Sequence, residues 1–497
     1  MKRLEDIKYF ATEDSITVYW RKPELDVGCY ELFLDGISKG VTEKTFFKIR
    51  NVQPDTTYRL CIRCSAAETE LMVASGKKRR RLDVTKAPYH ACGDGVGMNT
   101  NALQQAFDDC GFGETVYFPP GTYRTGALRL HSDMELYLDE GAVLQGTDVP
   151  EDYLPRIPSR FEGIMQECYS SLLNLGQMDH NDGYHCRNVI IRGGGTIASG
   201  GKILAERIIE AEKARLNDFL AAQAGWVGEC EKPETIPGRV RPRLVNISNC
   251  QNVILSGVNF RDGASWNVHM IYSDSIVTEG CKFYSQDVWN GDGWDPDSST
   301  NCAVFGCTFH TGDDSVAIKS GKNPEGNLVA RPAEHIWVFD CSCLGGHGIT
   351  VGSEMSGGVS DVDIWDCDLA QSKYGVEVKG TKKRGGYVRN VHVRDCVLPR
   401  VMMHSVGYND DGAGAPVPPV FENCIFENLQ ILGLYADRNA GYLPCDAIDL
   451  SGFQRPGYEL KNIVFRNIVI GGGQDGRKQT VSLQHCENIT LERIKCL

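Results

Sequence analysis

The stretch 252-NVILSGVNF-260 decides the fold, because the same apolar pattern returns at 276-IVTEGCKF-283 and 303-AVFGCTF-309. Further copies are found at 336-IWVFDC-341, 362-VDIWDC-367, 391-VHVRDC-396, 424-CIF-426, 463-IVFRNI-468 and 489-ITLERI-494. Successive copies lie mostly about 23 to 34 residues apart, a range typical of stacked structural repeats. One copy cannot bury its apolar face alone, so the copies must share one long core. The sequence therefore predicts an all-β protein built on a parallel β-helix.

The cysteines support this reading, because several of the 20 in the chain fall at one position of the repeat. They are Cys281, Cys307, Cys341, Cys367, Cys396 and Cys424. Neighbouring parallel strands lie about 4.8 Å apart, and a column of small apolar side chains fits that spacing. The chain has no Cys/His spacing typical of zinc sites. We expect reduced, buried thiols that pack in the core.

Residues 15–64 follow a different pattern, the period-two alternation of short antiparallel strands. The segments are 15-SITVYW-20, 29-CYELFLDG-36, 45-TFFKI-49 and 57-TYRLCIRC-64. They predict a small antiparallel β-sandwich. Trp20 and Tyr58 resemble the core tryptophan and the tyrosine corner of fibronectin type III domains. We therefore expect a sandwich over residues 1–81, a basic solvated linker or strand edge at 77–81, and the β-helix over 82–497.

Charge and hydropathy exclude several classes of function. The net charge is −13, with 52 Lys+Arg against 65 Asp+Glu, which argues against nucleic acid as a partner. No apolar run approaches the roughly 20 residues that cross a bilayer, so we expect no membrane association. The segment Met1–Ile7 lacks the apolar stretch and cleavage site of a secretory signal. From these features we expect a cytoplasmic protein.

Four segments place ionisable residues where the repeat otherwise holds apolar ones. They are 290-NGDGWDPD-297, 312-GDDSVAIKSG-321, 345-GGHGIT-350 and 374-YGVEVKG-380. In a solenoid of this repeat length, consecutive segments lie on consecutive rungs, so we expect one polar patch. Asp313 and Asp314 alone would suit a calcium-binding turn or a solvated loop. With Asp292 and His347 on the adjoining rungs they favour acid–base chemistry, because clustered carboxylates push their pKa values apart.

In this order the segments resemble the four signature motifs of the polygalacturonase family, glycoside hydrolase family 28: Asn-x-Asp, Gly-Asp-Asp, Gly-His-Gly and Arg-Ile-Lys. The stretch 352-GSEMSGG-358 also resembles bacterial members, and the likeness covers nearly everything from residue 82 onward. It implies a right-handed parallel β-helix of the pectinase type that hydrolyses α-linked galacturonate in pectic oligosaccharides. We expect no cofactor and no metal ion.

The resemblance also implies the role of each catalytic residue. Asp313 would protonate the glycosidic oxygen, and Asp292 with Asp314 would hold and deprotonate the attacking water. His347 would tune or orient the acid. Inversion at the sugar requires the acid and base carboxyls to stand about 6.5 to 9.5 Å apart, with room for the water between them.

The fourth motif departs from the family, since Glu377 stands where the family has arginine and only Lys379 remains. In the family that arginine helps to bind a substrate carboxylate beside the cleaved bond. Glu377 would instead suit a neutral sugar, as in rhamnogalacturonan or xylogalacturonan fragments, unless nearby cations compensate. The candidate substrate-binding residues are Asn290, Lys319, Glu377, Lys379, Arg384 and His269.

Two other functions remain open at this point. A pectate lyase shares the fold, but its chemistry needs an arginine base and calcium-held uronate. A non-catalytic carbohydrate-binding β-helix would keep the fold without the chemistry. Homo-oligomerisation is possible.

We further expect action from chain ends. A protein inside the cell would meet only imported fragments, and the segment 322-KNPEGNLVARP-332 is long enough to wall off one end of a cleft.

Overall fold

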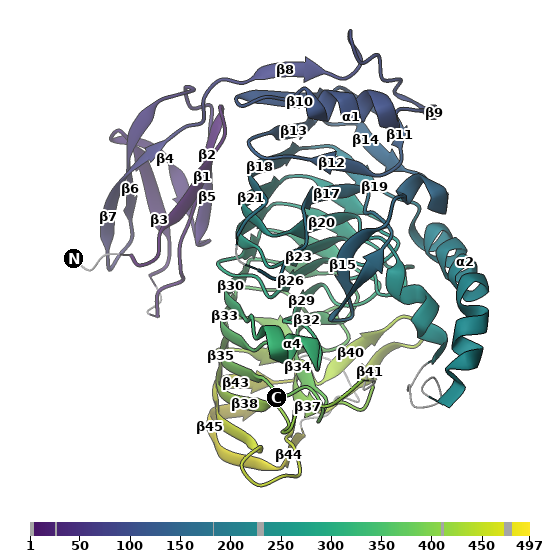
Figure 1. Ribbon diagram of the computed structural model, residues 1–497. Coiled ribbons are helices and arrows are strands. Elements are labelled where there is room, and N and C mark those ends of the chain that lie inside the picture. The colour runs from purple at the N-terminus through teal and green to yellow at the C-terminus, as the bar shows by residue number, and fades with distance from the viewer. Residues whose placement is uncertain (1–3, 25–26, 182, 226–232, 409–411, 472–479) are drawn as a thin grey trace. The chain divides into compact units, whose positions relative to one another are not determined.

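The computed structural model describes residues 4–24, 27–181, 183–225, 233–408, 412–471 and 480–497. The chain divides into two compact units (Figure 1). The first consists of Met1–Arg81 with Gly111–Thr115, and the second of Leu82–Cys110 with Val116–Leu497. Strand β8 (Arg80–Asp83) spans the boundary between them along the chain.

The first unit contains two antiparallel sheets around one core. One sheet has the order β1 (Lys8–Ala11), β2 (Ser15–Tyr19), β5 (Phe46–Arg50). The other has the order β4 (Ile37–Thr42), β3 (Tyr30–Leu34), β6 (Thr57–Arg63), β7 (Glu68–Ala74). Trp20 is fully buried in their core, and the hydroxyl of Tyr58 accepts a hydrogen bond from the Gln53 backbone at 2.8 Å. The predicted antiparallel sheet domain is confirmed, while its likeness to fibronectin type III domains stays a prediction.

The second unit is a parallel β-helix made of three long sheets, as predicted. The longest contains β10 (Glu114–Phe118), β13 (Glu135–Leu138), β18 (Cys186–Gly193), β21 (Cys250–Ser256), β24 (Asp274–Glu279), β27 (Ala303–Phe305), β30 (Ala333–Phe339), β33 (Val359–Trp365), β35 (Tyr387–Arg394), β38 (Val420–Glu427), β43 (Leu460–Ile470) and β45 (Cys486–Cys496), with the short β36 (Val397–Leu398) and β39 (Gln430–Ile431). The next contains β9 (Asp94–Met98), β11 (Gly121–Thr125), β14 (Ala142–Gly146), β19 (Thr196–Ala198), β22 (Asn259–Arg261), β25 (Lys282–Tyr284), β28 (Thr308–His310) and β31 (Ser342–Cys343).

The third sheet has eleven strands and carries the polar segments. Its strands are β12 (Leu128–Leu130), β17 (Leu173–Gly176), β20 (Val245–Ser248), β23 (Val268–Ile271), β26 (Trp294–Asp297), β29 (Val316–Ile318), β32 (Gly348–Val351), β34 (Gly375–Gly380), β37 (Val401–Ser405), β42 (Ile448–Ser451) and β44 (Val481–Gln484). Figure 1 shows these strands stacked along the length of the β-helix.

The core of the β-helix is a stack of equivalent side chains. Phe283 lies between Phe260 and Phe309, with ring centroids 5.2 and 4.7 Å away. The six cysteines of the predicted ladder are buried free thiols, and the backbone N–H of Cys281 donates to the sulfur of Cys307 at 3.3 Å. No disulfide joins any cysteine within the described ranges. The ladder therefore packs the core, as the repeat predicts.

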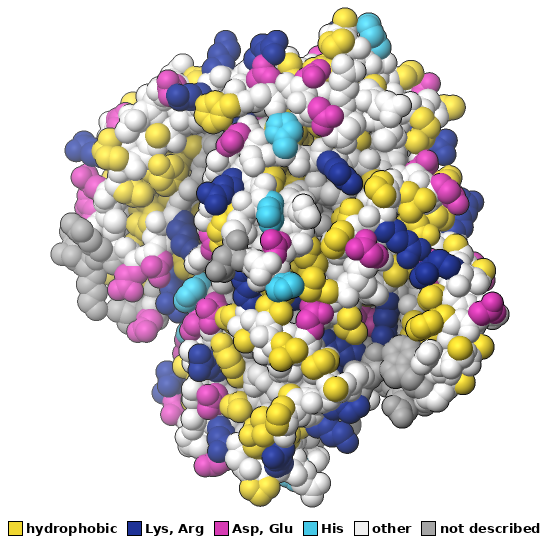
Figure 2. Space-filling model, viewed as in Figure 1, with side chains coloured by type: hydrophobic (Ala, Val, Ile, Leu, Met, Phe, Trp, Pro, Cys, Tyr) yellow, Lys and Arg dark blue, Asp and Glu magenta, His cyan; other side chains and the backbone are white. Residues whose placement is uncertain are grey.

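Helices and hairpins decorate the β-helix. The helices are α1 (Thr100–Asp108), α2 (Gly201–Ala222), α4 (Glu325–Val329) and the 3-10 turns η1 (Pro150–Tyr153) and η2 (Pro233–Val240). The hairpins are β15 (Ile157–Phe161) with β16 (Ile164–Cys168), and β40 (Leu434–Asp437) with β41 (Gly441–Pro444). Among the described helices, none is long and apolar enough to cross a membrane. Figure 2 shows acidic and basic side chains interspersed on one face, so the negative net charge forms no single acidic patch there.

Candidate active site

Strand register places the four polar segments on neighbouring rungs. Trp294 of β26 pairs with Val316 of β29, Val316 with Ile349 of β32, and Ile349 with Val376 of β34. The residue two positions before each of these partners occupies an equivalent place on its rung. These equivalent residues are Asp292, Asp314, His347 and Tyr374. The segments therefore form one column along the sheet.

Glycines flank this column because the rungs approach too closely for a Cβ atom. A Cβ on Gly293 would lie 2.4 Å from the carbonyl oxygen of Ser315. A Cβ on Gly348, whose φ is +106°, would lie 2.3 Å from the carbonyl oxygen of Gly375. The glycines that follow Asp292 and His347 are thus required by the backbone.

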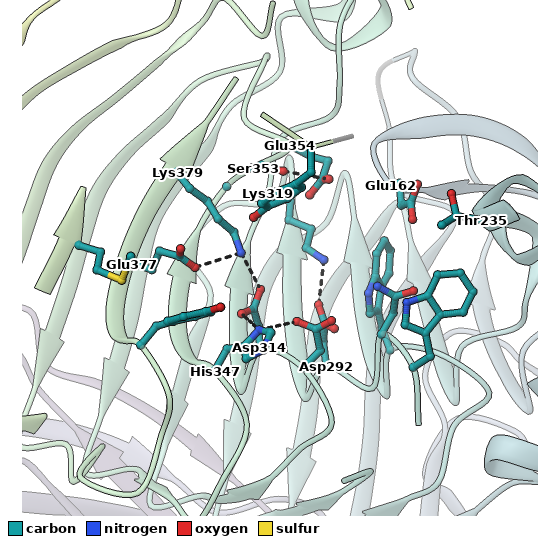
Figure 3. A pocket seen from close by; sticks show the side chains of 18 of the residues that line it. Glu162, Thr235, Asp292, Asp314, Lys319, His347, Ser353, Glu354, Glu377 and Lys379 are labelled. Atoms are coloured by element: carbon teal, nitrogen blue, oxygen red, sulfur yellow. Dashed lines mark hydrogen bonds and ion pairs between the residues drawn. The ribbon is translucent and has the colours of Figure 1, made fainter. Parts of the chain in front are cut away.

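A pocket of about 380 Å³ opens over the column (Figure 3). Its predicted lining residues are Asn290, Asp292, Asp313, Asp314, Lys319, His347, Glu377 and Lys379. Residues that the sequence did not single out as site residues also line it: Glu162, Thr235, Arg239, Trp266, Trp289, Gly352, Ser353, Glu354, Tyr374, Met402, His404 and Tyr408. A concave site with convergent charged groups of this kind is typical of a small-molecule site.

Lys319 organises one half of the pocket. Its ammonium lies 3.0 Å from Asp292, 3.4 Å from Asp295 and 3.7 Å from the ring centroid of Trp266. Burial alone would lower the pKa of Lys319, but the two carboxylates outweigh it and raise that pKa. Lys319 is therefore a fixed cation in the wall of the pocket.

The two carboxyls beside Lys319 have pKa values above their ordinary range. Burial raises the pKa of Asp292 well above its ordinary value, although Lys319 opposes the shift. Burial likewise raises the pKa of Asp295 to about 7. One oxygen of each carboxyl is buried and accepts no hydrogen bond from any described residue. These groups are poised to take up a proton or a bound water.

Asp313, Asp314 and His347 form the centre of the pocket. The imidazole Nδ1 of His347 lies 2.8 Å from Asp313 and 3.4 Å from Asp314, and the hydroxyl of Thr350 donates to Asp314 at 2.8 Å. Although burial opposes it, the pair of carboxylates raises the pKa of His347 to about 11. Burial would raise the pKa of Asp313, but the imidazolium outweighs it and the pKa falls. In the unliganded pocket His347 is thus protonated and Asp313 ionised.

These directions differ from the assignment that the family resemblance implies. A general acid must hold a proton, yet the surroundings lower the pKa of Asp313 and raise that of Asp292. The proton nearest to Asp313 is held by its partner His347. The acid and base roles of the three aspartates therefore stay predictions, and the pair Asp313–His347 carries one proton between its members.

Lys379 organises the other half of the pocket. Its ammonium lies 3.1 Å from Glu377 and 3.7 Å from Asp314. The second oxygen of Glu377 lies 2.7 Å from Nε2 of His404, on the next rung. Burial would raise the pKa of Glu377, but Lys379 and His404 lower it to about 2. Glu377 is therefore an anion already held by two basic groups, not a free acceptor for a sugar.

Two predicted substrate-binding residues lie behind the pocket wall. His269 is fully buried, with Nε2 3.3 Å from Asp297 and Nδ1 3.4 Å from the Arg243 guanidinium. Arg384 is fully buried and donates to the backbone oxygen of Ser353 at 2.9 Å. Neither lines the pocket, so direct substrate contact by these two residues stays a prediction. Both side chains support residues that line it.

Asn290 does line the pocket, and its side chain is held from behind. The guanidinium of Arg241 donates to Asn290 Oδ1 at 2.6 Å and stacks 4.2 Å from the ring centroid of Trp289. The amide nitrogen of Asn290 is thereby free to point away from Arg241. The motif asparagine is fixed in one orientation before any ligand arrives.

Several lining residues that the sequence did not single out come from outside the repeat. Glu162 lies in the turn of the β15–β16 hairpin, Arg239 in η2, and Tyr408 after β37. Such insertions have no periodicity from which their position can be derived. His404 is different, because it pairs in register with Lys379 on the adjacent strand. Counting one further rung from the fourth motif would have found it.

The segment 322–332 does not line the pocket, contrary to expectation. It instead supports the hairpin that does: the backbone N–H of Lys322 donates to the Gly163 oxygen at 2.9 Å, and Glu325 accepts from the Met165 backbone at 3.1 Å. The wall at this end is made by Glu162 together with Thr235 and Arg239.

Two groups of described residues have ligand atoms close enough for a metal ion. In the group Asp313, Asp314 and His347, the imidazole nitrogen that faces the carboxylates holds a proton, which a metal would have to displace. The ammonium of Lys379 adds a second positive charge beside Asp314. This donor set fits a proton better than a metal.

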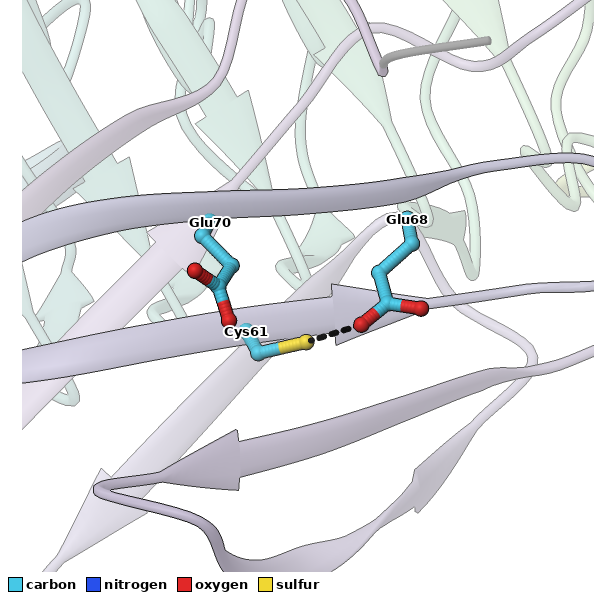
Figure 4. A group of neighbouring side chains, drawn as sticks. All are labelled: Cys61, Glu68 and Glu70. Carbon is cyan, nitrogen blue, oxygen red and sulfur yellow. Dashed lines mark hydrogen bonds between the residues drawn. The ribbon is translucent and has the colours of Figure 1, made fainter. Parts of the chain in front are cut away.

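The other group consists of Cys61, Glu68 and Glu70 in the first unit (Figure 4). Arg63 already pairs with Glu68 at 3.3 Å. Burial raises the pKa of the Cys61 thiol, which disfavours the thiolate that a metal requires. Arg63 and Glu68 thus form an ion pair between the neighbouring strands β6 and β7.

Comparisons with known proteins agree with the geometry. The model of glycosyl hydrolases family 28 matches residues 177–409, which include all four polar segments. The chain is 25% identical over 482 residues to an exo-poly-alpha-D-galacturonosidase of Dickeya chrysanthemi, covering 93% of this chain and 78% of that protein. It is 30% identical over 323 residues to a probable polygalacturonase of Vitis vinifera, covering 62% and 59% of the two chains.

Solved structures share the fold. A family 28 exopolygalacturonase of Yersinia enterocolitica aligns over 100% of both chains with a TM-score of 0.82 at 22% identity. A hyperthermoactive exopolygalacturonase of Thermotoga maritima aligns over 84% of this chain and 91% of that chain, with a TM-score of 0.69 at 25% identity. Together with the motif column, these matches make the chain a glycoside hydrolase whose residues 177–409 are similar to glycosyl hydrolases family 28.

Proposed function

We propose that the protein hydrolyses α-linked galacturonate from the ends of pectin-derived oligosaccharides, with inversion at the sugar. The observation that carries this proposal is the pocket in which Asp292, Asp313 and Asp314 lie between two buried lysines, Lys319 and Lys379. Relatives named for exo action on polygalacturonate support the same choice of substrate.

The chemistry needs one proton donor and one bound water. Asp313 gives a proton to the glycosidic oxygen as the bond from that oxygen to the anomeric carbon breaks. Water held by Asp292 and Asp314 gives up a proton to a carboxylate, and its oxygen bonds to the anomeric carbon from the opposite side. No other reactant is consumed.

The proton for Asp313 is held beside it, on His347 at 2.8 Å. A bound uronate brings a further negative charge into a pocket from which it displaces water. Loss of water disfavours charged groups, so it raises the pKa of Asp313, lowers that of His347 and moves the shared proton of the pair toward Asp313. His347 therefore acts as the store from which Asp313 is protonated.

End-on action follows from the walls of the pocket. Glu162, Thr235 and Arg239 line the pocket and come from a hairpin and a 3-10 turn that lie outside the rungs. Figure 3 shows Glu162 and Thr235 at the end of the pocket opposite Glu377. Arg239 pairs with Glu162 at 3.0 Å, which ties the two insertions together. A polymer that enters here meets side chains where an open groove would let it continue.

The test is digestion of galacturonate oligomers of defined length. We expect release of monomer from one end, products whose new anomeric centre is first seen by NMR as the β form, and no ultraviolet-absorbing unsaturated ends. A spread of intermediate lengths would refute end-on action, and unsaturated ends would identify a lyase. Cleavage of rhamnogalacturonan or xylogalacturonan fragments without cleavage of galacturonate oligomers would overturn the substrate assignment.

A further inference from the structure

His404 differs from the other basic side chains that line the pocket. Lys319 faces two carboxylates, Lys379 faces two, and Arg239 pairs with Glu162. His404 meets one carboxylate, that of Glu377, through Nε2. Within the described ranges, its second ring nitrogen, Nδ1, makes no hydrogen bond or ion pair. His404 therefore has a polar atom to spare for a ligand.

The position of His404 is fixed by two neighbouring rungs. It lies on β37 in register with Lys379 on β34, and its partner on the far side, on β42, is Ser451. Its side chain is 20% exposed, whereas Glu377 beneath it is 4% exposed. Glu377 thus holds Nε2 of His404 from the buried side, and the ring edge with Nδ1 is left toward the pocket.

Charged and polar groups surround His404 on both neighbouring strands. Glu377 is ionised, so it accepts a hydrogen bond from Nε2. Lys379 lies on the same strand as Glu377, and Tyr408 borders the same end of the pocket. On β42, Asp449 pairs in register with Met402, two residues before His404. A substrate carboxylate at Nδ1 would give the ring an anion on each side.

We propose that His404, held by Glu377, recognises the carboxylate of the galacturonate unit bound at this end of the pocket. The pair supplies from two strands the positive group that a single side chain at position 377 would otherwise supply. The proposal rests on the proposed function, because it names the residue that reads the uronate in that same site.

The test compares His404→Gln with wild type in the full chain, using a galacturonate trimer as substrate. Glutamine keeps a hydrogen-bonding group but cannot carry charge. We expect KM to rise roughly ten- to hundredfold, as for loss of one hydrogen bond to a charged group, with kcat changed less than about twofold.

The chain offers a matched control, His392→Gln. His392 forms the same kind of pair, with Nε2 2.9 Å from Glu427 and 24% exposure, but on the longest sheet and away from the pocket. Its replacement should leave KM unchanged. A second variant, Glu377→Gln, should raise KM as well, because the ring of His404 loses the carboxylate that holds Nε2.

The outcomes separate this inference from the proposed function. If wild type cleaves no galacturonate oligomer, the proposed function fails. If wild type cleaves them and the KM of His404→Gln equals that of wild type, His404 does not recognise the carboxylate. A loss confined to kcat would make His404 a positioning residue and would equally overturn the proposal.

Discussion

The two faces of the eleven-stranded sheet differ completely although they belong to the same strands. The inward residues are apolar and buried: Trp294, Val316, Ile318, Ile349, Val351, Val376 and Val378. Of the outward residues beside them, Glu377 and Lys379 line the pocket. Asp295 and Thr350 contact the lining residues Lys319 and Asp314. Neighbours in sequence thus serve the core and the chemistry in alternation.

Because side chains alternate between the two faces of a strand, adjacent residues contribute either to stability or to catalysis. Inward side chains contribute apolar burial, and outward ones hold charges in place over that rigid base. Substitutions on the two faces should therefore produce different signatures, one in unfolding and one in turnover. Lys319 tests this separation, because it is an outward residue that is buried beside two carboxylates.

The largest effect is expected from the outward carboxylates. Asp313→Asn should lower kcat by about 10² to 10⁴, the usual contribution of a general acid, with the free energy of unfolding little changed. The control is Asp218→Asn, on the exposed side of α2. The roles can be told apart with an aryl galacturonide that has a good leaving group. Loss of the acid should be largely rescued on that substrate, and loss of the base in Asp292→Asn should not.

If Asp313→Asn is not rescued but Asp292→Asn is, the acid is Asp292. That outcome would match the pKa directions in the unliganded pocket rather than the family assignment.

The next prediction tests whether an outward residue also contributes to the stability of the fold. Lys319→Met leaves the buried Asp292 and Asp295 without their cation, and breaking a buried pair typically costs about 3 to 5 kcal/mol. We expect a loss of this order in urea unfolding, together with loss of activity. Lys282→Met, at an exposed site on β25, is the matched control. Unchanged stability would show that water reaches both carboxyls.

A smaller effect concerns the pH dependence of stability at His347. The folded pKa of about 11 lies above the ordinary 6.5, so its stabilisation is full below pH 6.5 and fades as pH rises toward 11. Relative to His347→Gln, wild type should gain on the order of 1.5 to 3 kcal/mol near pH 6.5, and the difference should shrink at higher pH. Denaturant unfolding across this range measures it. A difference that grows with pH would mean that His347 is neutral.

The smallest effect is expected on the inward face of the neighbouring sheets. Cys341→Ala removes one buried sulfur from the ladder and should cost about 1 kcal/mol, with kcat/KM unchanged. Thiol titration of denatured wild type without reductant should find most cysteines free. Altered turnover in Cys341→Ala would show that the core and the pocket are coupled.

The sequence predicted well those features of the fold and of the site that depend on the repeat of the rungs. Asp292, Asp314 and His347 come together because each lies at the same distance before a register-matched core residue, and that distance is visible in the sequence. Which outward side chains are covered by an insertion is not visible in the sequence. His269 alternates outward like Asp295, yet Phe161 of the β15–β16 hairpin stacks on the adjacent Trp266, and the segment is covered. The sequence also did not show which basic groups pair with Glu377, because its partners Lys379 and His404 depend on distances within and between strands.

The hairpin turn at Glu162 has a consequence for how a chain is shortened. When one end of a pocket is walled, the sugar freed by a cut lies behind the remaining oligomer and cannot leave past it. The oligomer must dissociate first, the monomer then follows, and a new end must be captured for the next cut. Successive cuts of one molecule are therefore independent encounters, and a mixture of chains should shorten together rather than one at a time.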